Sequence, residues 1–175
     1  GGTITIDGDL YLKDFIATSG HTYSIDGDNC LMVYGSMELE SGISFIGNVY
    51  IGFYSTESNE TLKSNGVVLP YVTFSNLGTF TLLDDFETYD ELNIFSGIFD
   101  ANDNDVTFNS FQVDCGEDGK NITIHMGSGI WSMNGVEGGW YVRDPGEYTL
   151  DIQCETSTFI MNAADQMFLN AVGQT

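Results

Sequence analysis

The chain repeats itself from its first strand onward: Thr3-Ile4-Thr5-Ile6-Asp7-Gly8-Asp9-Leu10-Tyr11-Leu12 recurs as Thr22-Tyr23-Ser24-Ile25-Asp26-Gly27-Asp28-Asn29-Cys30-Leu31, with six of ten positions identical. A third copy, Gly47-Asn48-Val49-Tyr50-Ile51, matches Gly8 to Leu12 conservatively, and Gly66-Val67-Val68-Leu69 is a weaker fourth. The glycines at positions 8, 27, 47 and 66 therefore follow one another at a nearly constant interval. Self-similarity at a fixed period of this length is the signature of a repeat architecture.

A second motif occupies the C-terminal half of the chain. Ser96-Gly97-Ile98-Phe99-Asp100-Ala101-Asn102 aligns with Ser128-Gly129-Ile130-Trp131-Ser132-Met133-Asn134, with four of seven positions identical. Gly78-Thr79-Phe80-Thr81-Leu82 and Ser157-Thr158-Phe159-Ile160-Met161-Asn162 follow the same pattern. Because side chains alternate along a strand, the aromatic residue of each copy lies on one face and its neighbours lie on the other.

Short runs of β-branched and aromatic residues, separated by turn clusters, predict an all-β chain. Two or three such strands fit into the glycine interval, which matches one turn of a β-solenoid whose coils bury their apolar faces by stacking. We therefore expect a β-solenoid, with strands of successive coils stacked on one another. An antiparallel β-sandwich or jelly roll is the alternative, because it also consists of many short strands.

The expected domain organisation is one solenoid segment over residues 1–175. Residues 1–77 form regular turns of about 19 residues, and residues 78–175 form longer turns with inserted loops. The two candidates for inserted loops are 116–120 and 136–145, which are rich in turn-forming residues. We expect this segment to be an excerpt of a longer polypeptide.

The charge balance limits the possible partners. The chain has 26 Asp and Glu against 4 Lys and Arg, a formal net charge of −22. Nucleic acid and anionic membrane surfaces need clustered basic residues, so both are excluded. No apolar run is long enough for a membrane-spanning helix. Cations, neutral glycans and proteins remain.

The three cysteines Cys30, Cys115 and Cys154 show no zinc or redox spacing. One disulfide with one thiol left over, or three buried free thiols, are both compatible with the sequence.

The C-terminal half resembles a known repeat. The matching residues are Ser96 to Asn102, Asp105-Val106-Thr107-Phe108, Asn121-Ile122-Thr123-Ile124-His125, Gly127 to Gly135, Trp140, Thr156-Ser157-Thr158-Phe159 and, in place of a glycine-rich loop, Ala164 to Thr175. This pattern is similar to repeats in tail and surface proteins of bacteriophages and prophages. The resemblance implies a right-handed parallel β-helix in a non-catalytic virion or surface protein, with homotrimers as the usual assembly.

The Asp-Gly-Asp copies are a candidate metal site. If the copies stack one turn apart, Asp7, Asp9, Asp26 and Asp28 bring four carboxylates together, and calcium prefers such oxygen ligands. The alternative is that these are solvated turn residues, because Asp-Gly favours tight turns in any case. Asp100, Asn102, Asp103 and Asp105 form a second acidic turn with the same two interpretations.

An enzymatic role is the weaker hypothesis. A polysaccharide depolymerase needs two carboxylates about 5–10 Å apart. Glu38 with Glu40, or Asp84 with Asp85, could supply such a pair. The only arginine, Arg143, lies in a sequence typical of a turn. His21 and His125 have no patterned nucleophile or acid partner, so we expect no enzymatic activity.

Trp140 and Tyr141 are candidate contact residues. They lie in a glycine-rich stretch and could contact a glycan or a protein. Trp131 occupies the aromatic position of the repeat, so we expect it in the core.

Taken together, these features predict a structural or adhesive segment of a phage tail fibre, spike or other virion exterior protein. Its partners would be copies of itself, neighbouring virion or surface proteins, or a host glycan. An extracellular polysaccharide depolymerase and a calcium-dependent bacterial or archaeal surface-layer or filament subunit are the alternatives.

Overall fold

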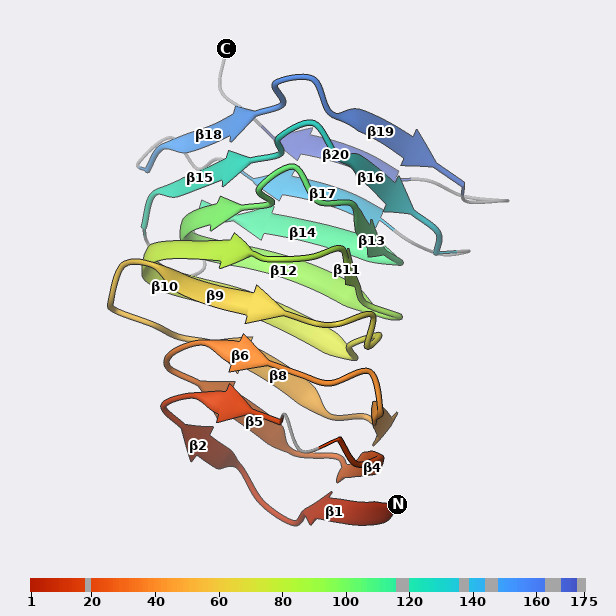
Figure 1. Cartoon of the computed structure of the whole chain (residues 1–175). Coiled ribbons are helices and arrows are strands. Elements are labelled where there is room, and N and C mark those ends of the chain that lie inside the picture. The colour runs from red at the N-terminus through yellow and green to blue at the C-terminus, as the bar shows by residue number, and fades with distance from the viewer. Residues whose placement is uncertain (18–19, 116–119, 136–138, 144–147, 163–167, 173–175) are drawn as a thin grey trace.

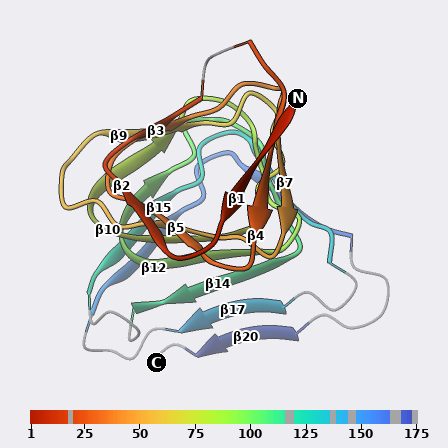
Figure 2. The ribbon, with the colours of Figure 1, turned by 90° about the horizontal axis from the view of Figure 1, so that it is seen from below.

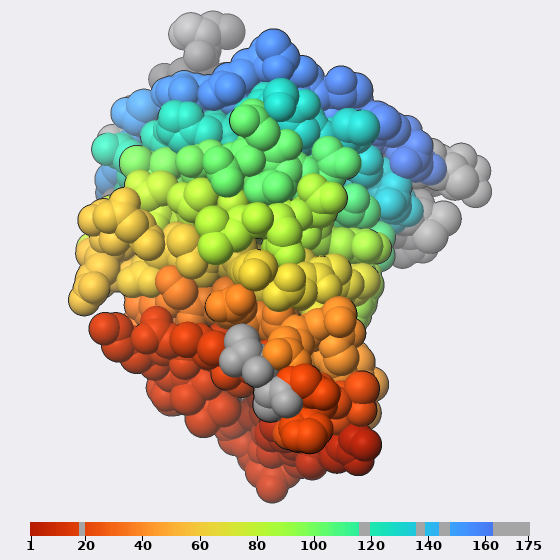
Figure 3. Space-filling view, in the orientation of Figure 1, coloured from red at the N-terminus to blue at the C-terminus, as the bar shows by residue number. Residues whose placement is uncertain are grey.

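The computed structural model describes residues 1–17, 20–115, 120–135, 139–143, 148–162 and 168–172. Within them the chain is a β-solenoid, in which strands from successive coils stack in parallel (Figure 1). Each coil carries up to three strands, so the solenoid has three faces. The N-terminal coil lies at one end and the C-terminal strands at the other, and successive coils form successive bands of the surface (Figure 3).

The first face carries the strands that begin each coil: β1 (Gly2–Ile6), β4 (Tyr23–Gly27), β7 (Ile43–Gly47), β11 (Phe86–Glu87), β13 (Val106–Phe108), β16 (Ile130–Met133) and β19 (Thr158–Met161). The second face carries β2 (Leu10–Leu12), β5 (Cys30–Val33), β8 (Tyr50–Phe53), the first parts of β10 (Tyr71–Leu82) and β12 (Glu91–Asp100), β14 (Ser110–Asp114), β17 (Gly139–Arg143) and β20 (Phe168–Val172). The third face carries β3 (Phe15–Ile16), β6 (Met37–Glu38), β9 (Glu60–Lys63), the second parts of β10 and β12, β15 (Ile122–His125) and β18 (Leu150–Gln153).

The pairing pattern decides between the two expected architectures. Every strand pair in the described residues is parallel, for example β1 on β4 and β10 on β12. A sandwich or jelly roll would require antiparallel neighbours. Viewed from the N-terminal end, the chain runs clockwise as it recedes, so the solenoid is right-handed (Figure 2). The predicted parallel β-helix is therefore confirmed.

The core is made of columns of inward-facing side chains, one residue per coil. On the second face one column runs Leu12, Val33, Phe53, Phe74, Ile94, Val113 and Val142. The Phe53 and Phe74 rings stack with centroids 4.9 Å apart and planes only 9° from parallel. This separation matches the spacing of about 4.8 Å between neighbouring strands, so each ring packs on the ring of the next coil.

The period of the coil is close to the expected one. A second column on the same face runs Leu10, Leu31, Ile51, Val72, Leu92, Phe111 and Trp140. Its members are separated by nearly equal numbers of residues as far as Phe111, and the sequence separation from Phe111 to Trp140 is clearly longer. On this face the turns therefore lengthen only after Phe111, rather than from residue 78.

The predicted register of the first copies is wrong by two residues. The sequence alignment places Ile6 opposite Ile25, whereas β1 pairs Ile4 with Ile25 and sets Ile6 opposite Gly27. Gly27 does lie opposite Gly47, as predicted, but Gly8 lies outside that column. A slip of two residues keeps every side chain on the same side of the sheet, so the alternation pattern alone could not detect it.

The second motif divides into two sets that lie on different faces. Trp131 pairs with Phe159 and Met133 with Met161 on the first face, as the alignment predicts. Likewise Phe80 pairs with Phe99. However, Phe99 belongs to the third face and Trp131 to the first, so the predicted equivalence of these two copies is wrong.

Two predicted loops contain strands instead. Residues 139–143, predicted as part of an inserted loop, form β17 and pair with β14. Residues 168–172, which take the place of a glycine-rich loop in the resemblance, form β20 and pair with β17. The other predicted loop, 116–120, lies outside the described residues except for Lys120. Buried Trp131 confirms the predicted core aromatic.

None of the three cysteines forms a disulfide, so the alternative with one disulfide is not realised. The alternative of three buried thiols is not realised either. Cys115 is buried, whereas Cys30 is half-buried and Cys154 is exposed.

Candidate functional site

A hollow on the outer side of the second face is a candidate site lined by several tyrosines. It has a volume of about 220 Å³ and lies where the first face turns into the second. We call it the tyrosine slot; its lining includes Asn48, Tyr50, Pro70, Tyr71, Tyr89 and Asp90. These residues come from three successive coils, so the stacking of the coils creates the slot.

The rings of the slot are held in place by contacts between coils. Tyr50 and Tyr71 are neighbours in the parallel register, and their ring centroids lie 4.9 Å apart. Tyr89 reaches back two coil lengths, past the coil of Tyr71, and its hydroxyl donates a hydrogen bond to the Gly47 carbonyl at 3.2 Å. Because each ring is fixed by another coil, the slot is formed before any ligand arrives.

The tyrosine hydroxyl groups are already engaged within the protein. The Tyr50 hydroxyl lies 3.4 Å from the Tyr54 hydroxyl and accepts a hydrogen bond from Thr73. The Tyr71 hydroxyl donates to the Glu91 carboxylate. With the Tyr89 hydroxyl bonded to Gly47, what these side chains offer to the slot is mainly ring surface.

Burial and nearby carboxylates hold these tyrosines in the neutral form. Burial raises the pKa of Tyr71, and the hydrogen bond and negative charge of Glu91 raise it further. Burial also raises the pKa of Tyr50. The pKa of Tyr89 is raised by burial and then by the charge of Asp90. Burial is the largest cause of these shifts, and Asp90 and Glu91 add negative charge beside the slot.

We expect a spectroscopic titration to show these raised pKa values. At pH 11 the folded chain should have fewer than its nine tyrosines ionised, whereas the urea-unfolded chain should ionise all nine near pH 10. The Tyr71→Phe variant should lose part of the late-titrating absorbance. Since the raised pKa favours the neutral phenol in the folded state, its contribution to stability is present below pH 10 and declines as pH rises above it. Nine tyrosines ionising together near pH 10 in the folded chain would contradict this expectation.

A second feature is a set of corner carboxylates that tie one coil to the next. Asp9 accepts a hydrogen bond from the Cys30 amide at 3.2 Å, and Asp105 accepts one from the Ile130 amide at 2.7 Å. Asp14, Asp85 and Asp103 make equivalent bonds to backbone amides about one coil further on. At the corners the strand ladder is interrupted, so these side chains satisfy amides that would otherwise lack a partner.

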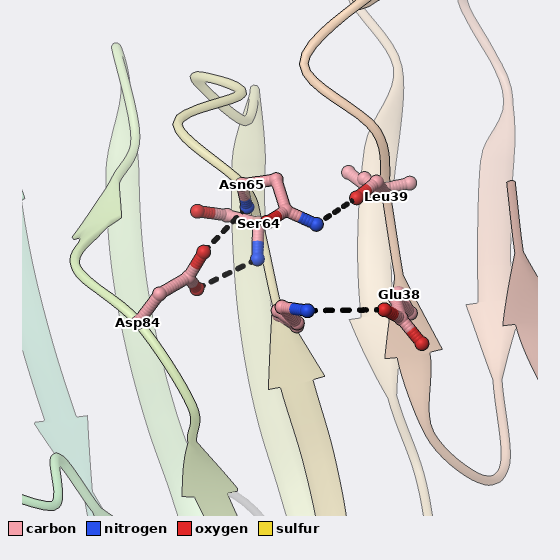
Figure 4. A network of polar contacts seen from close by, with 6 residues as sticks. Glu38, Leu39, Ser64, Asn65 and Asp84 are labelled. Carbon is pink, nitrogen blue, oxygen red and sulfur yellow. Dashed lines mark hydrogen bonds and ion pairs between the residues drawn. The ribbon is translucent and has the colours of Figure 1, made fainter. Parts of the chain in front are cut away.

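Asp84 is the clearest case of such a carboxylate. It accepts hydrogen bonds from the Ser64 amide at 2.8 Å and the Asn65 amide at 2.5 Å, both on the preceding coil (Figure 4). The Asn65 side chain continues the connection to the Leu39 carbonyl of the coil before that. Beside this chain of contacts, Lys63 and Glu38 form an ion pair at 3.2 Å.

Removing the Asp84 carboxylate should destabilise the fold measurably. We expect Asp84→Ala to lower the free energy of unfolding by about 1–3 kcal/mol, because two backbone amides lose a charged acceptor. The control is Asp7→Ala, which removes the same charge from an exposed position and should change stability by less than about 0.5 kcal/mol. Equal effects of the two variants in urea unfolding would contradict a role for the Asp84 hydrogen bonds.

The four aspartates of the calcium hypothesis do not stack as the sequence alignment places them. The register sets Thr5, not Asp7, opposite Asp26. Asp9 bonds to the Cys30 amide, and Asp28 accepts bonds from the backbone and side-chain nitrogens of Asn48 at 3.4 and 3.2 Å. Among the described residues, no three His, Cys, Asp or Glu side chains form a group that could hold a metal ion. Calcium binding at these positions stays a prediction.

The second acidic turn is also held together by hydrogen bonds. Asn102 and Asp103 have left-handed backbone conformations, with φ of 51° and 63°. The Asp100 carboxylate accepts the Asn102 amide, and Asp103 accepts the Ser128 amide. Asn102 and Asp103 occupy the conformation that Asn and Asp adopt more readily than most residues, which explains why the turn is rich in them.

The carboxylate pairs of the depolymerase hypothesis all have structural partners. Glu38 pairs with Lys63, and Glu40 accepts the Gly20 amide. Asp84 and Asp85 bind backbone amides of the coils on opposite sides of them. Arg143, predicted in a turn, instead ends β17 and forms an ion pair at 3.3 Å with the buried Asp114 of β14.

The predicted contact residues Trp140 and Tyr141 are neighbours on β17 but face opposite ways. Trp140 follows the inward column, and its ring packs on Phe111 at 4.4 Å and against Phe159 at 4.6 Å. Tyr141 pairs with Gln112 on the outer side of the sheet. The geometry therefore leaves Tyr141 as the better placed of the two to contact a partner.

Comparison with protein-family models, with curated proteins and with solved structures returned no match. Within the described residues no helix is long and apolar enough to cross a membrane. The class of the protein is therefore defined by its fold alone, as a right-handed parallel β-solenoid.

Proposed function

We propose that this chain is a non-catalytic structural and adhesive β-solenoid segment, which works as a rigid spacer in the exterior of a phage virion or a comparable surface appendage. Its role is to hold a fixed shape and to present its outer faces to neighbouring subunits or to a host surface. The sequence resemblance to phage tail and surface repeats motivates the virion setting.

The observation that carries the proposal is the continuity of the contacts between coils. Parallel pairing links each strand to the next coil, and large side chains such as Phe53, Phe74 and Trp131 fill the interior. Corner carboxylates add further bonds between coils. Because these corner carboxylates form hydrogen bonds between coils, the structure is suited to being rigid rather than to catalysing a reaction.

The test is to locate the protein and to measure its activity side by side. Gold-labelled antibodies against the chain should decorate the exterior of virions or cells in the source material under electron microscopy. The purified chain should release no reducing ends from a panel of polysaccharides. Label confined to the cell interior would overturn the exterior role, and release of reducing ends would establish the depolymerase alternative.

A further inference from the structure

The tyrosine slot has the features of a site for an organic cation. It combines aromatic side chains of three coils with the Asp90 carboxylate, and Glu91 lies beside Tyr71. None of its lining residues is basic. The whole chain, with four basic and 26 acidic residues, adds a negative field that concentrates cations near its surface.

We propose that the tyrosine slot binds an alkylammonium group, either a small quaternary amine or the side chain of a lysine on a partner protein. Aromatic ring surface attracts such cations through the ring quadrupole, and the attraction strengthens where water is partly excluded. A carboxylate at the edge of the slot supplies the balancing charge. The proposal goes beyond the scaffold role and does not depend on it.

The state of the hydroxyl groups favours a cation over a neutral sugar. Sugars are recognised by ring stacking together with several hydrogen bonds to their hydroxyl groups. In the slot, the Tyr50, Tyr71 and Tyr89 hydroxyls are bonded to Thr73 and Tyr54, to Glu91 and to Gly47. An alkylammonium group needs few hydrogen bonds and uses the ring surface and the carboxylate that remain. Anionic ligands are excluded by Asp90 and by the net charge.

The volume sets the size of the ligand. A hollow of about 220 Å³ is smaller than the usual pocket for a drug-sized molecule, so it fits one small group rather than an extended chain. A single site of this kind predicts weak binding, with a dissociation constant for a small probe in the millimolar range.

The probe is choline, titrated into the full chain at low salt and followed by NMR. We expect saturable shifts that are absent with 3,3-dimethylbutan-1-ol, the neutral molecule of the same shape. Asp90→Asn preserves the shape of the slot and should weaken choline binding about 5- to 10-fold. Tyr89→Ala opens the slot and should abolish binding. Tyr34→Ala, which removes a tyrosine outside the slot, is the control and should bind choline normally.

Further titrations test whether the cation comes from a protein or from a small amine, and whether the slot binds a sugar instead. Stronger binding of a lysine-containing peptide than of choline would identify a protein partner, and the reverse order a small amine. Thermal unfolding of each variant shows whether it is folded. Failure of choline, butylammonium and the lysine peptide alike to bind would overturn the proposal, as would equal binding of the neutral alcohol. Binding of methyl glucoside instead would assign the slot to sugars, and none of these results would alter the scaffold role.

Discussion

Replacing Phe74 with alanine should lower the free energy of unfolding by about 3–5 kcal/mol, the largest effect that we expect from a single substitution. Phe74 is fully buried, and its ring contacts Phe53, Phe80 and Phe99 at centroid distances of 4.9–5.0 Å, and Phe86 at 6.4 Å. These rings come from neighbouring coils and from different faces, so the cavity would open where the faces of the solenoid meet. Urea or guanidinium unfolding measures the change.

The control for this experiment is Tyr34→Ala, which removes a comparable ring from a position that is 46% exposed. We expect a change of about 0.5 kcal/mol or less there. A loss below about 1 kcal/mol for Phe74→Ala would show that the coils collapse around the missing ring. That result would contradict a single, tightly packed core that is continuous along the solenoid.

The period and the inward columns of this fold could be predicted from the sequence because both depend on local alternation. Strand residues such as Cys30 to Val33 and Val106 to Phe108 alternate between core and more exposed positions, and the recurring glycines set the approximate coil length. The register could not be predicted in the same way. Aligning identical residues placed Ile6 on Ile25, but the coil circumference puts Ile4 there instead.

The assignment of motifs to faces failed for a related reason. Phe99 and Trp131 each end a pattern of a small residue, a β-branched residue and an aromatic residue. This pattern fits any strand that follows a corner glycine and points an aromatic side chain inward. In a three-faced coil, three faces satisfy that description equally well. Only the contacts between coils, such as Trp131 on Phe159 rather than on Phe99, determine which face each copy occupies.

The tyrosine slot was missed in the sequence because its residues are far apart and follow no known motif. One signal was present: Tyr50 and Tyr71 are separated by one coil length, so they are expected to stack. Tyr89 gave no such signal, because its contact with Gly47 reaches back two coil lengths. Spacing analysis of aromatic residues at the solenoid period could have found the pair but not the third ring.

The second large effect concerns salt. We expect the melting temperature to rise by about 5–10 °C between 10 mM and 500 mM NaCl, equivalent to roughly 2–4 kcal/mol for a chain of this size. A net charge of −22 on one compact rod makes neighbouring carboxylates repel, and screening shortens the range of that repulsion from about 30 Å to a few ångströms. The corner hydrogen bonds and the core are barely affected by salt, so the change reports the repulsion.

The same experiment decides the calcium hypothesis when NaCl is replaced by CaCl₂ at equal ionic strength. If calcium acts only by screening, the two salts should give melting temperatures within about 1–2 °C of each other, apart from the stronger screening by a divalent ion. A specific site would add a saturable rise that depends on the logarithm of calcium concentration and that magnesium does not reproduce. Replacing Asp7, Asp9, Asp26 and Asp28 with asparagine should then remove the extra rise. A melting temperature that falls or stays constant as salt is added would contradict the view that charge repulsion destabilises this fold.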